Sequence, residues 1–461
     1  MALLAAVCML VFSCAPRRHY DLAVTHARVF DVHTGAVSNG STILITGGRI
    51  ARVVADSSHP KFTATDTFDA AHRLVTPGFI DVHFHAGSVL ADSISLAPDS
   101  LAGYRETFAR AYLPYGITTV RSCGDPERWL PMLREWMHST PDSPDFYACG
   151  GALVSPNDRH YPGHVEVNGP DSARAKVREY HDAGLKHLKV YWRLREPEFA
   201  AVMDEARLLG MNVTGHVDYK VIGIERAMEL GLRQFEHAYT LGVDAIDSTG
   251  YAYINGQVFV DHYARYIKGE SVPGSFFISR IEAFNYLGSD NAAMLALIDS
   301  LRTRGAGVTP TLHVFAQRFG LTYFTTPSSR AGYDDTEVLS DSALTRCRGG
   351  YRILAGYVKK MFDAGNPLTV GSDWADPGKA CLSEMLLLHD CGIPMADVLT
   401  AATWNGAKEM GIEAETGSIE AGKKAHLIVF DNDPLVRPEN LLEGMTVIKD
   451  GVPSRSSQVE R

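Results

Sequence analysis

Hydrophobic and polar positions alternate near both ends of the chain, and this pattern predicts short β-strands there. The alternating segments are residues 20–29, 43–45 and 49–55 near the start and residues 426–430 and 446–449 near the end. Neither group contains enough strands to be stable alone. Because chain ends often lie close together, we expect residues 19–75 and 415–461 to form one small β-sandwich domain.

The middle of the chain, residues 76–414, alternates between strand-like and helix-like segments. The expected strands are residues 78–84, 116–121, 146–150, 185–191, 211–216, 233–237, 307–313 and 367–373. Amphipathic segments such as residues 172–183, 197–209 and 221–230 separate most of them. Eight strands alternating with helices predict an α/β fold, a (β/α)8 barrel of the TIM type. Residues 241–290 are too long for a simple connection, and we expect an insertion or lid there.

The first residues form an apolar run, residues 2–12, which has the length of a signal peptide and is too short to span a bilayer. It ends in Val-Phe-Ser-Cys, and residues 1–18 resemble a bacterial lipoprotein signal in which Cys14 carries the lipid. A plainly cleaved signal peptide and a cytoplasmic protein are the alternatives. We therefore expect export from the bacterial cytoplasm, to a lipid anchor on the membrane or to the periplasm. A lipid anchor would be the only contact with a membrane, since no later segment reaches transmembrane length.

Composition narrows the possible functions. The 461 residues carry a net charge of −10 and show no basic stripe, which argues against a nucleic-acid-binding protein. The hydrophobic content of 45% and charged content of 21% are ordinary for a globular protein. Seven cysteines show no paired zinc-finger spacing, so we expect most of them to be small buried hydrophobic residues. A homo-oligomer is compatible with the sequence, which identifies no subunit interface.

Candidate chemistry lies at the ends of the expected strands. His83 and His85 close the run Leu-Val-Thr-Pro-Gly-Phe-Ile-Asp-Val-His-Phe-His. Alternate residues of a strand face the same side, so both imidazoles could reach one metal ion. Barrel active sites lie at the C-terminal strand ends, and the remaining ends offer Lys189, His216, His237, His313 and Asp373. Imidazole and carboxylate suit zinc, whereas an inward lysine needs a chemical reason because a lone buried ammonium is costly.

These segments resemble the amidohydrolase superfamily, within it the branch of imidazolonepropionase-like proteins and Xaa-Pro dipeptidases. The matching segments are Pro-Gly-Phe-Ile-Asp-Val-His-Phe-His, Gly-Ile-Thr-Thr-Val-Arg at 116–121, Leu-Lys-Val-Tyr at 188–191, Gly-His at 215–216, Phe-Glu-His at 235–237, Gly-Ser-Asp at 371–373 and the tail from Thr416. In that tail the family usually has Asp where this chain has His426. The resemblance implies two divalent metal ions, zinc by expectation. His83, His85 and Asp373 would bind one ion, His216 and His237 the other, and a carboxylated Lys189 would bridge them.

The implied reaction is hydrolysis of an amide or cyclic amide bond in a small molecule or a dipeptide. Two cations beside one water would lower its pKa until hydroxide is available near neutral pH, and a metal ion would polarise the scissile carbonyl. Asp373 is the expected catalytic residue, since it can accept the proton of the water and pass it to the leaving nitrogen.

Four further residues are candidates for substrate binding. His164 follows the third expected strand, where related proteins carry a histidine loop over the substrate. Tyr191, Tyr219 and Arg121 could orient a substrate carboxylate, and each is equally compatible with packing or an ion pair.

Less specific interpretations remain for the site. Lys189 could be an ordinary ion-paired lysine, the histidines could be structural, and Asp373 could cap a turn. A mononuclear deaminase or imidazolone-type cyclic amide hydrolase is the main alternative function. Such enzymes usually carry Glu at the position of Tyr219, which favours two metal ions here. A non-catalytic binding protein on the same fold is the third possibility.

Overall fold

The computed structural model describes most of the chain, namely residues 18–59, 61–90, 94–156, 162–217, 221–250, 252–254, 275–324 and 341–456. Two positions singled out in the sequence, Cys14 and Tyr219, lie outside the described residues. Within these ranges, no helix is both long enough and apolar enough to cross a membrane.

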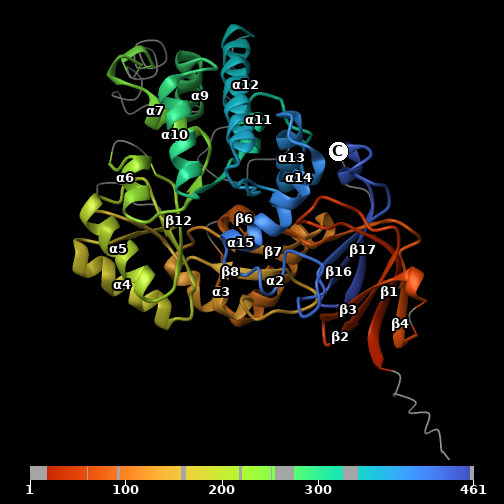
Figure 1. The fold of residues 1–461 in the computed structure, drawn as a ribbon. Coiled ribbons are helices and arrows are strands. Elements are labelled where there is room, and N and C mark those ends of the chain that lie inside the picture. The colour runs from red at the N-terminus through yellow and green to blue at the C-terminus, as the bar shows by residue number, and fades with distance from the viewer. Residues whose placement is uncertain are drawn as a thin grey trace, which may run out of the picture.

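Strands from both ends of the chain lie side by side in one eight-stranded sheet (Figure 1). They are β1 (His19–Val29), β2 (Ser41–Thr46), β3 (Arg49–Ala55), β4 (Thr63–Asp69), β5 (Leu74–Pro77), β15 (Leu427–Phe430), β16 (Met445–Lys449) and β17 (Val452–Ser456). The order is β17-β16-β15-β5-β1-β2-β3, and β4 pairs with β1. Antiparallel pairing of Val75 with Val429 joins the two groups, and both side chains are buried in the same cluster.

The middle of the chain forms parallel strands, as the alternation of strands and helices predicts. One sheet has the order β6-β7-β8, and a second has the order β10-β9-β11-β12-β13-β14. Their bounds are β6 (Phe79–Phe84), β7 (Ile117–Ser122), β8 (Asp145–Ala148), β9 (Ala152–Val154), β10 (His164–Glu166), β11 (His187–Val190), β12 (Asn212–Gly215), β13 (Gln234–Glu236) and β14 (Gly307–Thr309). All pairings within these two sheets are parallel. The fold is therefore α/β in its middle part.

Helices connect most of these strands. They are α1 (Gly87–Leu90), α2 (Pro98–Tyr112), α3 (Leu130–Trp136), α4 (Pro170–Asp182), α5 (Glu196–Leu208), α6 (Ile224–Glu229), α7 (Tyr239–Ala245), α9 (Ser275–Leu287), α10 (Ala292–Thr303), α11 (Leu312–Arg318), α12 (Asp341–Ala364), α13 (Pro377–Asp390), α14 (Met395–Thr400) and α15 (Gly406–Glu409). In α4, proline occupies the first position, and Ala173, Val177 and Tyr180 are buried at helical spacing. Helices α9, α10 and α12 stand together at the top of Figure 1.

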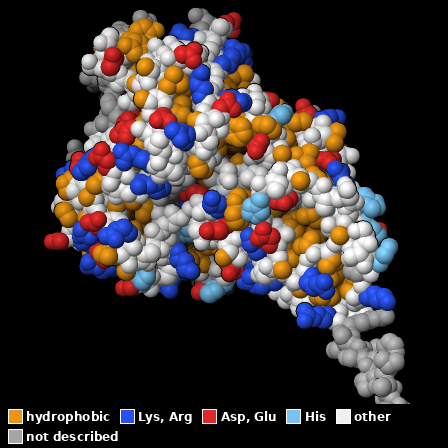
Figure 2. Space-filling model, viewed as in Figure 1, with side chains coloured by type: hydrophobic (Ala, Val, Ile, Leu, Met, Phe, Trp, Pro, Cys, Tyr) orange, Lys and Arg blue, Asp and Glu red, His pale blue; other side chains and the backbone are white. Residues whose placement is uncertain are grey.

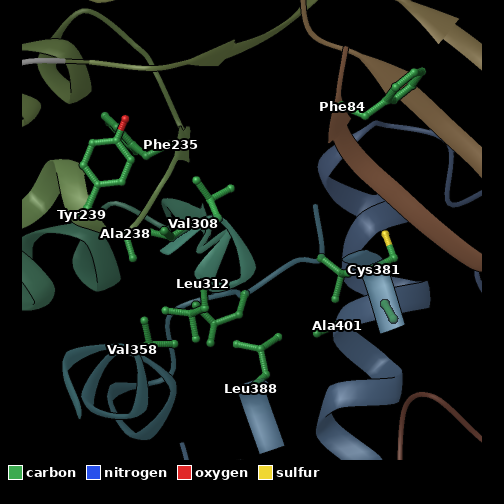
Figure 3. Close-up of a cluster of buried hydrophobic side chains, with 14 of the residues drawn as sticks. Phe84, Phe235, Ala238, Tyr239, Val308, Leu312, Val358, Cys381, Leu388 and Ala401 are labelled. Atoms are coloured by element: carbon green, nitrogen blue, oxygen red, sulfur yellow. The ribbon is translucent and has the colours of Figure 1, made fainter. Parts of the chain in front are cut away.

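One large hydrophobic core lies between the parallel strands and the helices. Figure 3 shows part of it, where Phe235 of β13 and Val308 of β14 gather with Leu312, Val358 and Leu388 of α11, α12 and α13. Since Phe235 faces the helices, its neighbours on β13 face the opposite side, toward the strand interior. The core thus fixes which side chains of each strand point inward.

The seventh and eighth expected strands differ from the prediction. The strand predicted over residues 307–313 ends at Thr309, and His313 lies in α11. Pro310 has no N–H to continue the ladder, and Thr311 takes a left-handed conformation with φ of 50°. The strand predicted over residues 367–373 is reduced to a parallel bridge between Val308 and Leu368 and isolated hydrogen bonds.

The surface shown in Figure 2 carries interspersed charges of both signs. Several are paired within one helix, such as Lys359 with Asp363 on α12 and Arg302 with Asp299 on α10. Such exposed pairs contribute little stability individually, so the charges that matter for the site are the buried ones.

Candidate metal centre

His83 and His85 leave the C-terminal end of β6 on the same side. Their ring centroids lie 5.5 Å apart. His83 is fully buried, whereas the side chain of His85 is 21% exposed. The pair therefore lies at the boundary between the strand interior and the solvent-accessible face.

Asp373 lies beside both histidines. One carboxylate oxygen, Oδ1, is 3.3 Å from His85 Nε2 and 3.6 Å from His83 Nε2. The other, Oδ2, is 3.8 Å from His237 Nδ1. The His237 ring is in turn 4.8 Å from the His83 ring and 4.7 Å from the His216 ring. Four histidines and one carboxylate, which come from four different strand ends, thus form a single cluster.

Two members of this cluster have unusual backbone conformations. His237 has φ of 66° and Asp373 has φ of 40°, in a region that residues other than glycine rarely adopt. Hydrogen bonds hold both: His237 N–H donates to Thr309 O (2.8 Å), and Asp373 N–H donates to His83 O (2.9 Å). Such conformations persist where the surrounding structure imposes them, and they concentrate at functional sites.

Lys189 points into the same cluster from β11. It pairs in register with Thr214 of β12, and its side chain is only 1% exposed. Its Nζ lies 3.8 Å from Glu236 Oε1 and has no hydrogen-bond partner in the described part of the chain. Its charge also helps lower the pKa values of His83 and His216, after burial as the larger cause. All six candidate ligands are therefore neighbours.

Glu236 is a buried carboxylate that the sequence reasoning missed. Its side chain is inaccessible to solvent, and its Oε2 lies 2.6 Å from His83 Nδ1. Oε1 accepts a short hydrogen bond from Thr214 Oγ1 and lies 3.3 Å from a terminal nitrogen of Arg121. Strand parity could have identified it, since Gln234 and Glu236 are polar at alternate positions of a buried strand.

Arg121, an expected substrate residue that was equally compatible with an ion pair, forms ion pairs within the protein. Its side chain is 1% exposed and lies within the strand interior. One terminal nitrogen is 2.7 Å from Glu409 Oε1, the other faces Glu236, and Nε donates to Val82 O at 2.9 Å. Nε and both terminal nitrogens of the guanidinium thus contact groups of the protein itself, as the ion-pair interpretation predicts.

Burial favours the neutral form of three of these histidines, His83, His216 and His237. Burial lowers the pKa of His83, lowers that of His216 well below the usual value, and lowers that of His237 to about 3. His85 Nδ1 contacts Gly124 O at 3.1 Å, and His237 Nδ1 contacts Thr311 Oγ1 at 2.8 Å. A carbonyl can only accept, so His85 carries its proton on Nδ1 and leaves Nε2 free to bind a cation.

Asp373 is ionised. Burial alone would raise its pKa, but the nearby His83, His85 and His237 lower the pKa well below its usual value. An ionised carboxylate beside neutral imidazoles is a donor set that suits a divalent ion such as zinc.

Unpartnered atoms provide an independent test of this fit. Nε2 of His83, Nδ1 of His216 and Nζ of Lys189 are buried without a hydrogen-bond partner among the described residues. Buried polar atoms are normally satisfied, so this concentration indicates a missing electropositive partner and a missing oxygen ligand. His83, His85 and Asp373 also lie close enough together to share one ion. The residues present therefore fit a metal centre.

A second cluster, Asp145, His426 and Asp450, is balanced by lysines instead. His426 Nε2 is 2.9 Å from Asp450 Oδ1, while Lys449 Nζ is 2.9 Å from Asp145 Oδ1 and 2.5 Å from Asp450 Oδ2. Lys424 also contacts Asp145. His426 is thus paired with the carboxylate of Asp450 within this cluster.

Aromatic and basic side chains line one side of the centre. The Tyr191 ring lies 4.7 Å from the His216 ring and 4.7 Å from the His164 ring. His164 Nδ1 is 3.1 Å from a terminal nitrogen of Arg193. Two of the expected substrate residues, His164 and Tyr191, are thus near the candidate ligands. Tyr219 lies outside the described residues, and Tyr239, whose hydroxyl is 3.4 Å from His216 Nε2, was not foreseen.

Comparison with known families and sequences gives one family match and several partial relatives. The Amidohydrolase family matches residues 74–255 and 357–452, which is more than half of the chain. An adenine deaminase of Cenarchaeum symbiosum (strain A) is 36% identical over 162 residues, 35% of this chain and 24% of its own length. An imidazolonepropionase of Agrobacterium fabrum is 36% identical over 90 residues, 18% of this chain and 20% of its own length. The chain thus spans less than a quarter of the length of these relatives.

Solved structures resemble the chain over nearly its whole length. A putative prolidase from Bifidobacterium longum has a TM-score of 0.66 at 24% identity and covers 96% of both chains. A Xaa-Pro dipeptidase with bound methionine in the active site has a TM-score of 0.63 at 20% identity, covering 94% of this chain and 100% of the other. At these identities the likeness establishes a shared fold.

Proposed function

The chain belongs to the amidohydrolase family, and from this premise we propose that it hydrolyses an amide bond of a dipeptide, an N-acylated amino acid or a cyclic amide. The observation that carries the proposal is the buried cluster in which His83, His85, His216, His237, Lys189 and Asp373 meet. The unpartnered nitrogen atoms of His83 and His216 can bind cations, and the carboxylate of Asp373 can serve as a ligand and a base.

Two divalent metal ions, zinc by preference, are proposed for the cluster. His83, His85 and Asp373 would hold one, His216 and His237 the other, and Lys189 carrying a CO2-derived carboxylate on Nζ would bridge them. When bound, such ions supply Lewis acidity, which lowers the pKa of water and polarises a carbonyl oxygen. The unpartnered Nζ of Lys189 supports the bridge, because a carboxylated lysine is an oxygen donor and no longer a buried ammonium.

The side chains of the protein would move the proton. Asp373 is ionised and partly accessible, so one of its oxygens can accept a proton from the attacking water. The same oxygen can then donate this proton to the leaving nitrogen, which allows the amide bond to break with a neutral amine as the product. Tyr191 and His164 would form the wall against which the substrate packs, since the Tyr191 ring adjoins the rings of both His216 and His164.

Deamination is the second candidate function, and the adenine deaminase relative gives it a specific basis. A deaminase of this kind would use one metal ion and leave Lys189 unmodified. The number of bound ions and the effect of Lys189 therefore separate the two proposals.

We further propose that the parallel strands close into one (β/α)8 barrel spanning residues 76–414. The bridge between Val308 and Leu368 and the hydrogen bond from Val82 N–H to Val370 O (3.0 Å) support closure between β14 and β6. Residues 19–75 and 415–461 would form the accompanying β-sandwich. From the sequence alone, we also propose that residues 1–18 direct export of the protein and that Cys14 carries a lipid.

Metal analysis of the purified protein tests the proposal. We expect about two zinc equivalents per chain in the wild type and a clear loss in Lys189→Ala. Lys186→Ala is the matched control, because Lys186 is exposed three residues earlier on the same segment. Cleavage of a library of dipeptides and N-acyl amino acids should accompany metal binding. About one equivalent, unchanged in Lys189→Ala, would instead support the mononuclear deaminase.

A further inference from the structure

We propose that Glu236 is a positioning residue of the metal centre, which holds the imidazole of His83 through its Nδ1 edge. The inference rests on the proposed function, since it concerns a residue that supports a proposed ligand. It adds a carboxylate outside the six residues that sequence reasoning assigned to the site.

The two edges of the His83 ring face two different carboxylates. Nδ1 lies 2.6 Å from Glu236 Oε2, and Nε2 lies 3.6 Å from Asp373 Oδ1. His83 Nδ1 and Glu236 Oε2 are in close contact, although they are not aligned as a hydrogen bond. Neither of these two atoms has a hydrogen-bond partner elsewhere among the described residues. A histidine that binds a metal through one nitrogen commonly presents the other to a carboxylate, which fixes the ring and raises its basicity.

Glu236 is itself held rigidly. Thr214 of β12 donates a hydrogen bond to Oε1, and Arg121 of β7 lies 3.3 Å from the same oxygen. Arg121 is anchored in turn through Nε to Val82 O, one residue before His83. Three strands therefore fix the carboxylate whose free oxygen faces the His83 ring, as a support for a metal ligand requires.

A simpler role, that of a counter-ion for Arg121 and Lys189, makes a different prediction. Glu409 offers the comparison within the same chain, because it pairs with Arg121 at 2.7 Å and contacts none of the candidate ligands in the described structure. Both carboxylates are buried. If Glu236 served only to balance charge, its loss and the loss of Glu409 would affect the protein in the same way.

The experiment compares Glu236→Gln with Glu409→Gln in the full-length protein. Zinc affinity is measured by competition with a chromophoric chelator, and thermal unfolding of the metal-free proteins is measured in parallel. We expect Glu236→Gln to weaken zinc binding about 10- to 100-fold, the usual effect of removing such a partner. Glu409→Gln should change zinc affinity less than about threefold, although it also perturbs Arg121. Thr214→Val, which removes one support of the carboxylate, should give an intermediate loss of affinity.

Equal zinc affinity in Glu236→Gln and Glu409→Gln would overturn the inference, and so would wild-type affinity in Glu236→Gln. If Glu236→Gln does not fold, Thr214→Val decides: zinc affinity equal to that of the wild type would overturn the inference. The proposed function fails separately, when the wild type itself binds no zinc.

Discussion

Replacing Arg121 tests whether this arginine is a structural element of the strand interior. Arg121→Met keeps an unbranched apolar side chain, shorter than that of arginine, but removes the positive charge, the contacts with two carboxylates and the hydrogen bond to Val82 O. Glu236 would then remain fully buried with Lys189 Nζ, at 3.8 Å, as its nearest cation.

The expected loss of stability depends on which of the two carboxylates, Glu236 or Glu409, stays charged when Arg121 is replaced. Burial raises the pKa of Glu409 to about 7, so this group can become neutral when its partner is lost. Glu236 is different, because His83 and Lys189 outweigh burial and hold its pKa well below the usual value. Breaking one buried pair destabilises a protein by about 3 to 5 kcal/mol, and Lys189 should keep the loss near 3 kcal/mol.

Urea unfolding at neutral pH measures this loss, and steady-state kinetics measure the effect on substrate. Arg110→Met is the control, since Arg110 forms a single exposed pair with Glu106 and should contribute less than about 1 kcal/mol. The KM for a substrate with a free carboxylate should stay close to the wild-type value. A stability within about 1 kcal/mol of wild type, together with a tenfold higher KM, would refute the reasoning and return Arg121 to the substrate site.

Two further predictions concern the second charge cluster and the packing behind His83. For Asp145, the nearby His426 and lysines outweigh burial and lower the pKa from 3.8 to about 2. The charge of Asp145 therefore stabilises the fold by about 2 kcal/mol above pH 4, and this stabilisation disappears as the pH falls toward 2. The difference in unfolding free energy between wild type and Asp145→Asn should therefore shrink over that range; a difference that is constant with pH would contradict this. In Gly371→Ala, the added Cβ would lie 2.7 Å from His83 Cβ, so we expect His83 to shift. This shift should lower kcat/KM about 100-fold, and unchanged kinetics would show that the site tolerates it.

The candidate residues at strand ends could be identified from the sequence because the same pattern, a strand-like segment that ends in a candidate ligand, recurs along the chain. His83, His216 and His237 each close a short segment that resembles a strand, and the strand ends of a barrel face the site. Lys189 and Asp373 also close expected strands, and the family resemblance then implied their roles as metal ligands. The α/β class followed from the same alternation of strands and helices.

Other features depend on contacts between distant segments, which a local pattern does not contain. For Arg121 the sequence left substrate binding and an ion pair equally open, because the carboxylate of Glu409 that engages it lies almost 300 residues later in the chain. Glu236 was overlooked because the adjacent His237 was enough to account for the Phe-Glu-His motif. The alternation of side chains along the strand nevertheless predicts that Glu236 faces inward. The short seventh strand was overestimated because the φ of Thr311 is set by tertiary structure.

The sheet formed from both ends of the chain also has a consequence for folding order. β5 pairs with β15, which is synthesised about 350 residues later, and β6 with its histidines begins two residues after β5 ends. Until β15 arrives, β5 presents an unpaired edge, and pairing over such a separation is slow because a long loop must close first. Docking of β15 is therefore a late step in folding. A chain interrupted before residue 427 would expose the unpaired edge of β5 next to an incompletely folded site, a feature that proteases and chaperones recognise.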